Sequence, residues 1–367
     1  MTQQTANGIL PAHILRQYFD EGHLTTQKQL DVDQIQPASL DLRLGVKAYR
    51  VRASFLPGPE RTVQDRLDEL SLHEISLSDG GAALETGCVY IVPLLEALNL
   101  PTGISAAANP KSSTGRLDIF TRVITDYAQE FDKIPDGYKG PLYAEISPRT
   151  FTILAREGSR LSQIRFRKGH DVALDQTIHD LHNQQPLITG GAYNVSNGLA
   201  LSVDLNGNDQ SQPVGFRAKR HSGIIDVDKK AALEVLDYWE PIWQRGSLIL
   251  EPDQFYILAS KEAVRVPPTH AAEMVPFDPL VGEFRVHYAG FFDPGFGDSQ
   301  SGGSGSRGVL EVRSHEVPFI LEDSQIIGRL VYEPLTEVPE QVYGQGIGSN
   351  YQKQGLKLSK HFHSFEP

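Results

Sequence analysis

Residues 84–101 read LETGCVYIVPLLEALNLP, and residues 250–267 read LEPDQFYILASKEAVRVP. The two stretches align without a gap, 166 positions apart. They share the pairs Leu84 and Leu250, Glu85 and Glu251, Tyr90 and Tyr256, Ile91 and Ile257, Glu96 and Glu262, Ala97 and Ala263, and Pro101 and Pro267. The same offset relates Glu145 in YAEISP to Glu311 in VLEVRS, and SRLSQIRF (159–166) to QIIGRLVY (325–332). One offset kept over about eighty residues predicts that a whole domain is duplicated.

Most of the repeated sequence favours short strands joined by turns. QPASLDLRLG (36–45) alternates leucines with polar residues, which predicts a half-buried strand. LPAHILRQYFDEG (10–22) predicts a short helix that ends near Gly22, and AALEVLDYWEPIW (231–243) also has apolar residues at helical spacing. We therefore expect an all-β fold, with two β-rich domains and a few short helices.

The repeat also sets the expected domain boundaries. We expect the first copy at 1–170 and a linker with the entry to the second copy at 171–215. The second copy then covers 216–340, and a tail at 341–367 could close as a lid over a charged ligand.

Composition excludes several classes of protein. The chain has 367 residues and a formal net charge of −12, so a nucleic-acid partner is not expected. It has one cysteine, which cannot build an internal disulfide or a thiolate metal site within one chain. No apolar stretch is long enough to span a membrane, and the N-terminus lacks the pattern of a signal peptide. We expect a cytoplasmic protein with no membrane partner.

The two copies differ at PKSSTGR (110–116), which aligns with PFDPLVG (276–282). Lys111, Ser112, Ser113 and Arg116 become Phe277, Asp278, Pro279 and Gly282. Lysine, arginine and hydroxyl side chains beside a glycine suit a phosphate group, although this is not a Walker A loop. An ordinary solvated turn is the alternative.

Three other features carry candidate residues. VHYAGFFDPGFG (286–297) predicts a tight turn begun by Asp293, whereas the corresponding ITDYAQEFDKIPDGYKG (124–140) is longer. Each hairpin leads into a strand with a glutamate, Glu145 or Glu311. The tail contains NYQKQG; the alternative to a lid is that it is a mobile end. The histidines in HDLH and HFH lack further nearby ligand residues, so they do not predict a metal site.

QPASLDLRLG, KSSTGRL, a strand glutamate and NYQKQG occur in this order along nearly the whole chain. This order resembles the dCTP deaminase branch of the dUTPase-like superfamily, in its long, two-domain bacterial form. The resemblance implies distorted, jelly-roll-like β-barrels that assemble as a homo-oligomer, with sites between subunits closed by the C-terminal tail. It implies deamination of dCTP to dUTP and ammonia, with dTTP as an inhibitor.

The resemblance also assigns residues to roles. Lys111, Ser112, Ser113 and Arg116 match a phosphate-binding and catalytic cassette, and Glu145 and Glu311 both match the catalytic glutamate. Ala289 and Asp293 match the hairpin that contacts the pyrimidine. In the tail, the matching nucleotide-binding residues are Tyr351, Lys353 and Gln354. Mg²⁺ would arrive on the triphosphate, and no zinc is implied.

The departures leave two arrangements open. The first copy has the cassette but an altered hairpin, and the second has the hairpin and the tail but no cassette. The site either combines both copies or lies in the first copy with Glu145, and the cassette slightly favours the second arrangement.

Two other functions also remain open. A dUTP diphosphatase, alone or combined with the deaminase, would need an acid such as Asp126 or Asp293 to activate water. A nucleotide-binding scaffold would bind dCTP without turnover.

Overall fold

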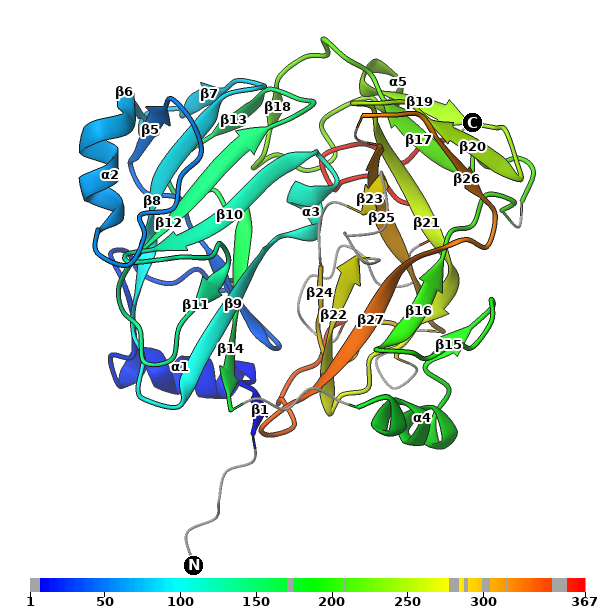
Figure 1. Ribbon diagram of the computed structural model, residues 1–367, viewed down its shortest axis with the longest axis horizontal. Coiled ribbons are helices and arrows are strands. Elements are labelled where there is room, and N and C mark those ends of the chain that lie inside the picture. The colour runs from blue at the N-terminus through cyan, green and yellow to red at the C-terminus, as the bar shows by residue number, and fades with distance from the viewer. Residues whose placement is uncertain are drawn as a thin grey trace, which may run out of the picture. The chain divides into compact units, whose positions relative to one another are not determined.

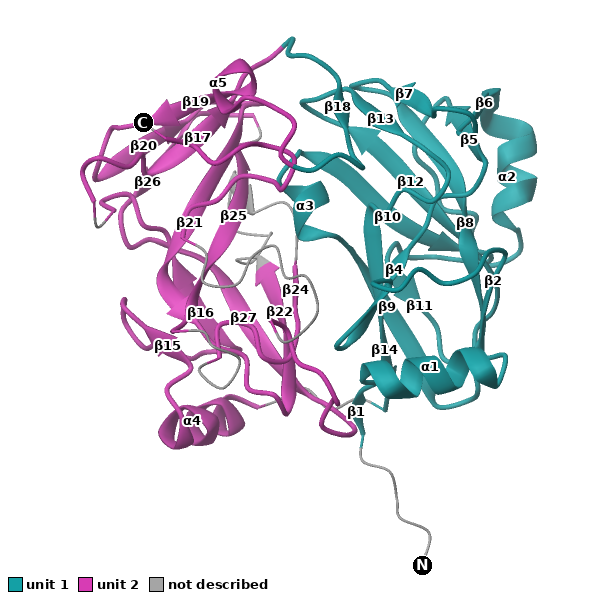
Figure 2. Cartoon of the chain, turned by 180° about the vertical axis from the view of Figure 1, so that it is seen from behind, with its two compact units in different colours: residues 1–170, 221–230 teal, residues 171–220, 231–367 magenta. Residues whose placement is uncertain are grey.

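The computed structural model describes residues 7–169, 174–207, 209–276, 284–286, 290–298, 304–314, 316–344 and 355–366. The chain divides into two units (Figure 2). Unit 1 contains residues 1–170 and 221–230, and unit 2 contains residues 171–220 and 231–367. Both are built mainly from antiparallel strands, as expected (Figure 1).

Among its described residues, unit 1 has two six-stranded sheets and one three-stranded sheet. The strand orders are β11-β9-β14-β4-β3 with β1 beside β14, β10-β12-β8-β5-β6 with β2 beside β8, and β18-β13-β7. Its helices are α1 (Ala12–Asp20), α2 (Val63–Leu70) and α3 (Ser112–Gly115). Its strands are β1 (Gly8–Ile9), β2 (Leu24–Thr26), β3 (Ile35–Gln36), β4 (Ser39–Leu42), β5 (Lys47–Val51), β6 (Ser71–Ser76), β7 (Ala82–Leu84), β8 (Val89–Asn99), β9 (Ile104–Pro110), β10 (Ile119–Thr125), β11 (Lys133–Ile134), β12 (Lys139–Pro148), β13 (Ile153–Ala155), β14 (Ser162–Lys168) and β18 (Ile225–Asp226).

Unit 2 repeats this plan. Its strand orders are β19-β17-β21-β25-β23 with β15 beside β21, then β16-β27-β22-β24, and β20-β26. Its helices are α4 (Asp175–Gln184) and α5 (Val235–Tyr238). Its strands are β15 (Ile188–Thr189), β16 (Leu199–Ser202), β17 (Gly215–Ala218), β19 (Trp239–Ile242), β20 (Ser247–Leu250), β21 (Phe255–Val264), β22 (His270–Pro276), β23 (Phe284–Val286), β24 (Phe291–Phe292), β25 (Ser306–Ser314), β26 (Phe319–Glu322) and β27 (Ile326–Pro334).

Strand register shows the duplication directly. Ile91 on β8 pairs with Glu145 on β12, and Ile257 on β21 pairs with Glu311 on β25. Both members of the second pair lie 166 positions after those of the first. The stretch expected to link the copies supplies α4, β15 and β16 to unit 2.

A buried glutamate recurs at the same place in both units. Glu96 accepts hydrogen bonds from the Arg43 backbone and side chain and from Gln34, each at 2.8 Å. Glu262 accepts from the backbone and hydroxyl of Ser202 at 2.8 and 2.7 Å. Both carboxylates are almost fully buried, so hydrogen bonds compensate for the loss of water. This glutamate is therefore part of the scaffold.

An arm formed by residues 221–230 completes the small sheet of unit 1. Its strand β18 pairs in parallel with β13. Arg156 donates to both carboxylate oxygens of Asp226, at 2.7 and 2.8 Å, and Ile225 is fully buried. Although the arm lies between β17 and α5 in the sequence, both of which belong to unit 2, it is a structural part of unit 1.

Two expectations about local structure were wrong, in each case because of tertiary contacts. All four residues of β4 are buried, so this strand is not half-buried; its polar Asp41 is enclosed by ion pairs. In 231–243 the helix covers only α5, and the chain then continues as β19, which pairs with β17. The first helix is confirmed as α1, followed by Gly22 with φ of 76°.

Candidate active site

The KSSTGR sequence (111–116), called the cassette below, forms one helical turn that leads into β10. α3 follows Lys111, whose carbonyl accepts from the Thr114 backbone at 2.8 Å. Ser113 and Arg116 are 5% and 3% exposed, so the cassette is not a solvated turn. It is a fixed part of unit 1.

Lys111 is held from two sides. Its backbone N–H donates to the carbonyl of Leu161 at 2.9 Å. Its ammonium group forms an ion pair with the buried carboxylate of Asp41 on β4. The side chain remains 20% exposed, so the ammonium is oriented but still accessible.

Strand β10 connects the cassette to the neighbourhood of Glu145. Ile119 at the start of β10 pairs with Pro148 on β12, and Arg122 pairs with Glu145. Since each strand residue advances by about 3.3 Å, Glu145 lies about 10 Å along the sheet from this first pair.

Glu145 is engaged by Arg122. Its Oε1 accepts from Arg122 Nε at 3.1 Å and from Nη2 at 2.5 Å. Arg122 also donates to Ser54 Oγ at 2.8 Å, and its guanidinium lies over the rings of Phe120 and Phe131. Glu145 is 1% exposed, and its Oε2 has no hydrogen-bond partner within the described structure.

Helix α2 contributes to the cover over this face of the sheet. Tyr49, Ile91 and Glu145 are cross-strand neighbours and share one face. Tyr49 and Ile91 pack in a cluster with Val63 and Leu67 of α2. The glutamate of the first copy therefore belongs to a closed face.

Glu311 occupies the equivalent position in unit 2. It is 5% exposed, lies on β25, and pairs through Ile257 with Phe216 on β17. The C-terminal segment (355–366) covers part of this face, because Phe365 packs edge-on against Phe216 with ring centroids 5.4 Å apart. Unit 2 thus uses its own C-terminus where unit 1 uses α2.

The C-terminal segment is well anchored. Phe362 forms a parallel β-bridge with Leu233 and lies against Tyr238 and Trp239, at ring-centroid distances of 5.5 and 6.0 Å. The described end of the tail is therefore packed on unit 2 and is not a mobile end.

Asp293 starts the predicted turn. Its carbonyl accepts from the backbone of Phe296 at 3.0 Å, and Gly295 and Gly297 have positive φ of 89° and 65°. These left-handed backbone conformations favour glycine, which explains both glycines of DPGFG. The other predicted residues of the second copy and the tail lie outside the described residues, namely Ala289, Tyr351, Lys353 and Gln354.

Asp126, considered as a water-activating acid, has a structural contact. Its Oδ1 accepts from the backbone N–H of Val63 at 2.8 Å, at the first residue of α2. Burial raises the pKa of Asp126, and burial together with Asp126 raises the pKa of Tyr143 to about 12. The carboxylate stabilises the start of the helix that covers Glu145.

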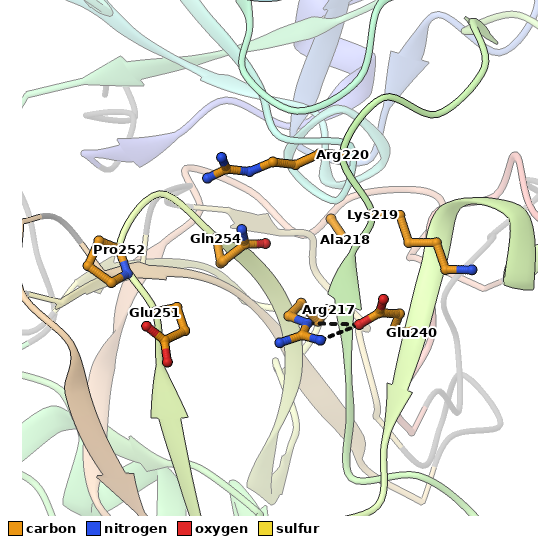
Figure 3. Close-up of a pocket in the computed structure, with 8 residues that line it drawn as sticks. All are labelled: Arg217, Ala218, Lys219, Arg220, Glu240, Glu251, Pro252 and Gln254. Carbon is orange, nitrogen blue, oxygen red and sulfur yellow. Dashed lines mark hydrogen bonds and ion pairs between the residues drawn. The ribbon is translucent and has the colours of Figure 1, made fainter.

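A polar pocket of about 820 Å³ lies in unit 2, at the ends of β17 and β19 and the turn before β21 (Figure 3). Arg217 Nε donates to Glu240 Oε2 at 2.9 Å, and Arg220 donates to the Asp253 carbonyl at 3.3 Å. None of the lining residues belongs to the predicted site, so this pocket adds nothing to it.

Searches for two other features gave negative results. The described residues contain no group of three or more His, Cys, Asp or Glu side chains placed to hold a metal ion. Within the same residues, no helix is long and apolar enough to cross a membrane.

Comparison with known proteins agrees with this architecture. Two family models match the chain, the N-terminal domain of 2′-deoxycytidine 5′-triphosphate deaminase at residues 6–170 and its C-terminal domain at residues 174–362. The chain belongs to the 2′-deoxycytidine 5′-triphosphate deaminase family. The fold is therefore the dUTPase-like all-β fold that was expected, present twice.

Individual relatives match either nearly the whole chain or less than half of it. The crystal structure of the 2′-deoxycytidine 5′-triphosphate deaminase from Agrobacterium tumefaciens is 64% identical, with a TM-score of 0.89, covering 93% of this chain and 99% of that one. The dCTP deaminase of Natronomonas pharaonis is 30% identical over 43% of this chain and 79% of its own. A dUMP-forming dCTP deaminase of Methanosphaera stadtmanae is 28% identical over 43% and 78%.

The structure therefore places the predicted residues in two groups. Unit 1 carries the cassette at α3 and Glu145 on β12, with β10 connecting them, and unit 2 carries Asp293 and Glu311. Sequence reasoning missed Asp41 and Arg122, which engage Lys111 and Glu145. A search for charged residues that are present in one copy and lost in the other would have found Asp41.

Proposed function

We propose that this protein hydrolyses dCTP to dUTP and ammonia. The cassette carries this conclusion, because it joins lysine, serine and arginine side chains in one fixed turn of a chain that belongs to the deaminase family. The Agrobacterium tumefaciens structure, which bears the deaminase name, covers both copies and supports this assignment.

The proposed reaction needs one carboxylate as a proton carrier. Water attacks C4 of cytosine while the glutamate takes one of its protons and passes it to N3. The second proton of water goes to the 4-amino group, the C4–N bond breaks, and ammonia leaves. Ser112 orients the water or the leaving group, and Arg116 stabilises the charge that develops beside it.

We propose Glu311 as this carboxylate, although the cassette alone slightly favoured Glu145. Arg122, which also donates to Ser54, holds Glu145 in a hydrogen-bonded ion pair beneath a face that α2 helps to close. The corresponding stretch of the second copy, HYA (287–289), contains no arginine. Glu311 also follows, in its own copy, the hairpin that carries Asp293 and Ala289.

The triphosphate end has its own candidate residues. Lys111, Ser112, Ser113 and Arg116 would hold phosphate oxygens, with Mg²⁺ arriving on the nucleotide as part of the substrate. Tyr351, Lys353 and Gln354 would contact the nucleotide from the tail. The family resemblance also supports a homo-oligomer in the cytoplasm and inhibition by dTTP.

The test is turnover of dCTP with Mg²⁺ by the full chain, with dUTP, dUMP, pyrophosphate and ammonia all measured. We expect dUTP and ammonia in equal amounts. Formation of dUMP and pyrophosphate would instead show the combined activity named for the Methanosphaera stadtmanae relative. Binding of dCTP without ammonia would show a scaffold and overturn the proposal.

Two isosteric variants identify the base. We expect Glu311→Gln to lower kcat by at least about 100-fold while dCTP still binds, the scale of a general acid–base contribution. Glu145→Gln should retain kcat within about fivefold in the folded protein. The reverse result would place the base in the first copy, and full activity in both variants would exclude a glutamate base.

A further inference from the structure

Lys111 of the cassette belongs to a network of charges on one side of unit 1. Asp41 Oδ1 forms the ion pair with Lys111 Nζ, and Asp41 Oδ2 lies 3.5 Å from Arg160 Nη1. Arg160 also pairs with Asp31 at 2.5 Å and with Asp33 at 2.8 Å. Burial raises the pKa of Asp33, but Arg160 outweighs it and the net pKa is lowered.

Backbone hydrogen bonds fix Asp41 and connect the segments that carry Lys111 and Arg160. The Asp41 N–H donates to the Gln34 carbonyl at 2.9 Å, and the Asp41 carbonyl accepts from Gln34 Nε2 at 2.9 Å. The Asp41 side chain is 2% exposed. Leu161, next to Arg160, receives the Lys111 N–H, so the two partners of Asp41 are also tied to each other.

The second copy has lost the three central members of this network. Gln163 pairs with Asp41, and Arg329, 166 positions later, pairs with Ala200, so Ala200 stands in the place of Asp41. By the 166-residue offset, Lys111 corresponds to Phe277 and Arg160 to Ile326. Glu96, by contrast, is retained as Glu262. The network is therefore found only in the copy that has the cassette, whereas the buried glutamate is found in both copies.

We propose that Asp41 and Arg160 are positioning residues that prepare Lys111 to bind the triphosphate, an inference that rests on the proposed function. An ammonium group has three N–H donors, and Asp41 occupies one, which leaves two for phosphate oxygens. Holding the lysine in place reduces the rotamer entropy that binding would otherwise remove.

Arg160 has a separate task. Asp31, Asp33 and Asp41 would otherwise place three negative charges next to a site for an anion, and Arg160 contacts all three. It therefore lets Asp41 hold Lys111 without opposing the triphosphate. Its guanidinium is suited to this because it stays charged and presents several donors in a rigid fork.

The experiment compares Asp41→Asn and Arg160→Gln with wild type for dCTP turnover, calorimetric dCTP binding and thermal stability. We expect both variants to raise KM and Kd for dCTP about tenfold, with kcat within about twofold, because one charge-assisted contact is lost or opposed. Asp226→Asn is the matched control, since it makes the same change at an arginine-paired carboxylate of the same unit that contacts no member of the network within the described residues. It should lower stability and leave KM unchanged.

A double-variant cycle separates positioning from general damage. In a Lys111→Met background, Asp41→Asn should change KM by no more than about twofold, because the side chain through which it acts is absent. A full tenfold effect in that background, or a fall in kcat at unchanged KM, would overturn the proposal. If Asp41→Asn does not fold, Arg160→Gln, whose side chain is partly exposed, tests the network in the wild-type background, where KM should rise about tenfold with kcat within about twofold.

Inorganic tripolyphosphate distinguishes failure of this inference from failure of the proposed function. Its calorimetric Kd should rise about tenfold in Asp41→Asn whether or not wild type deaminates dCTP. Equal affinity in wild type and variant would sink the positioning role alone. Absence of ammonia with wild type would sink the deaminase proposal alone.

Discussion

Arg122 and Glu145 face each other on adjacent strands of unit 1, and two nitrogens of the guanidinium hold one carboxylate oxygen. Phe120 and Phe131 lie against the guanidinium, so the pair is enclosed by aromatic surface. In the first copy, the glutamate that was predicted to be catalytic is therefore held in a structural ion pair.

Replacing Arg122 with Met should destabilise the protein by about 3 kcal/mol, because it leaves a buried carboxylate without its counter-charge. Urea unfolding measures the loss. Turnover per folded molecule should stay near wild type, since we assign the base to Glu311. A variant as stable as wild type would show that the pair contributes nothing.

The double variant Arg122→Met with Glu145→Met is the companion experiment. Removing both charges together should recover most of the lost stability, because no unpaired ion remains. If the double variant is less stable than Arg122→Met alone, aromatic packing and not charge compensation explains the single loss.

The arm should contribute stability that depends on pH. Hydrogen bonds from Arg156 lower the pKa of Asp226 to about 2, from an ordinary value of 3.8. Because the pKa of Asp226 is lower in the folded protein than in the unfolded chain, its carboxylate stabilises the fold fully above about pH 4. This stabilisation is lost as the pH falls from about 4 to about 2. The stability difference between wild type and Asp226→Asn should be about 1 kcal/mol at pH 6, reduced by partial exposure, and should shrink below pH 4. A difference that stays constant down to pH 2.5 would contradict this.

Phe362 should be the main anchor of the C-terminal segment. It is 6% exposed and packs on two aromatic rings, so Phe362→Ala should destabilise unit 2 by about 3 kcal/mol. Phe365→Ala, at a less buried ring, should cost less than half as much. Urea unfolding followed by tryptophan fluorescence reports on this packing through Trp239, and equal losses would show that the anchor is shared.

Gly45 should resist substitution for steric reasons. A Cβ at this position would lie 2.7 Å from the carbonyl oxygen of Pro93, which accepts the Gly45 N–H at 2.8 Å. Gly45→Ala should therefore destabilise unit 1 by about 1–3 kcal/mol. Gly355→Ala, where nothing lies within 4 Å, is the control, and comparable melting temperatures for the two variants would refute the steric argument.

The fold could be predicted because the sequence contains two copies of the same domain. A constant offset places Ile91 beside Glu145 and Ile257 beside Glu311, and the structure has both pairs in register. The arm could not be predicted, because β18 is two residues long and its partner β13 lies about seventy positions away. A short parallel pairing leaves no hydrophobic periodicity in the sequence.

The candidate site was accessible only in part. Lys111 and Arg116 could be predicted as site residues, because they lie in a basic, hydroxyl-rich stretch whose counterpart in the second copy has different residues. The contacts of those residues could not be predicted from local patterns, because the ion pairs join segments that are distant in the sequence. Asp41 looked like the solvent side of a half-buried strand until its contact with Lys111 was known.

The discontinuity of unit 1 restricts how the gene could be divided. A polypeptide ending at residue 170 would lack β18, Asp226 and the buried Ile225, and would expose the edge of β13. A polypeptide starting at residue 171 would still contain residues 221–230, but it would lack β13, the strand with which β18 pairs. Descendants of this duplicated gene can therefore separate into two single-barrel proteins only by rebuilding that edge, which would tend to preserve the fused form once it had arisen.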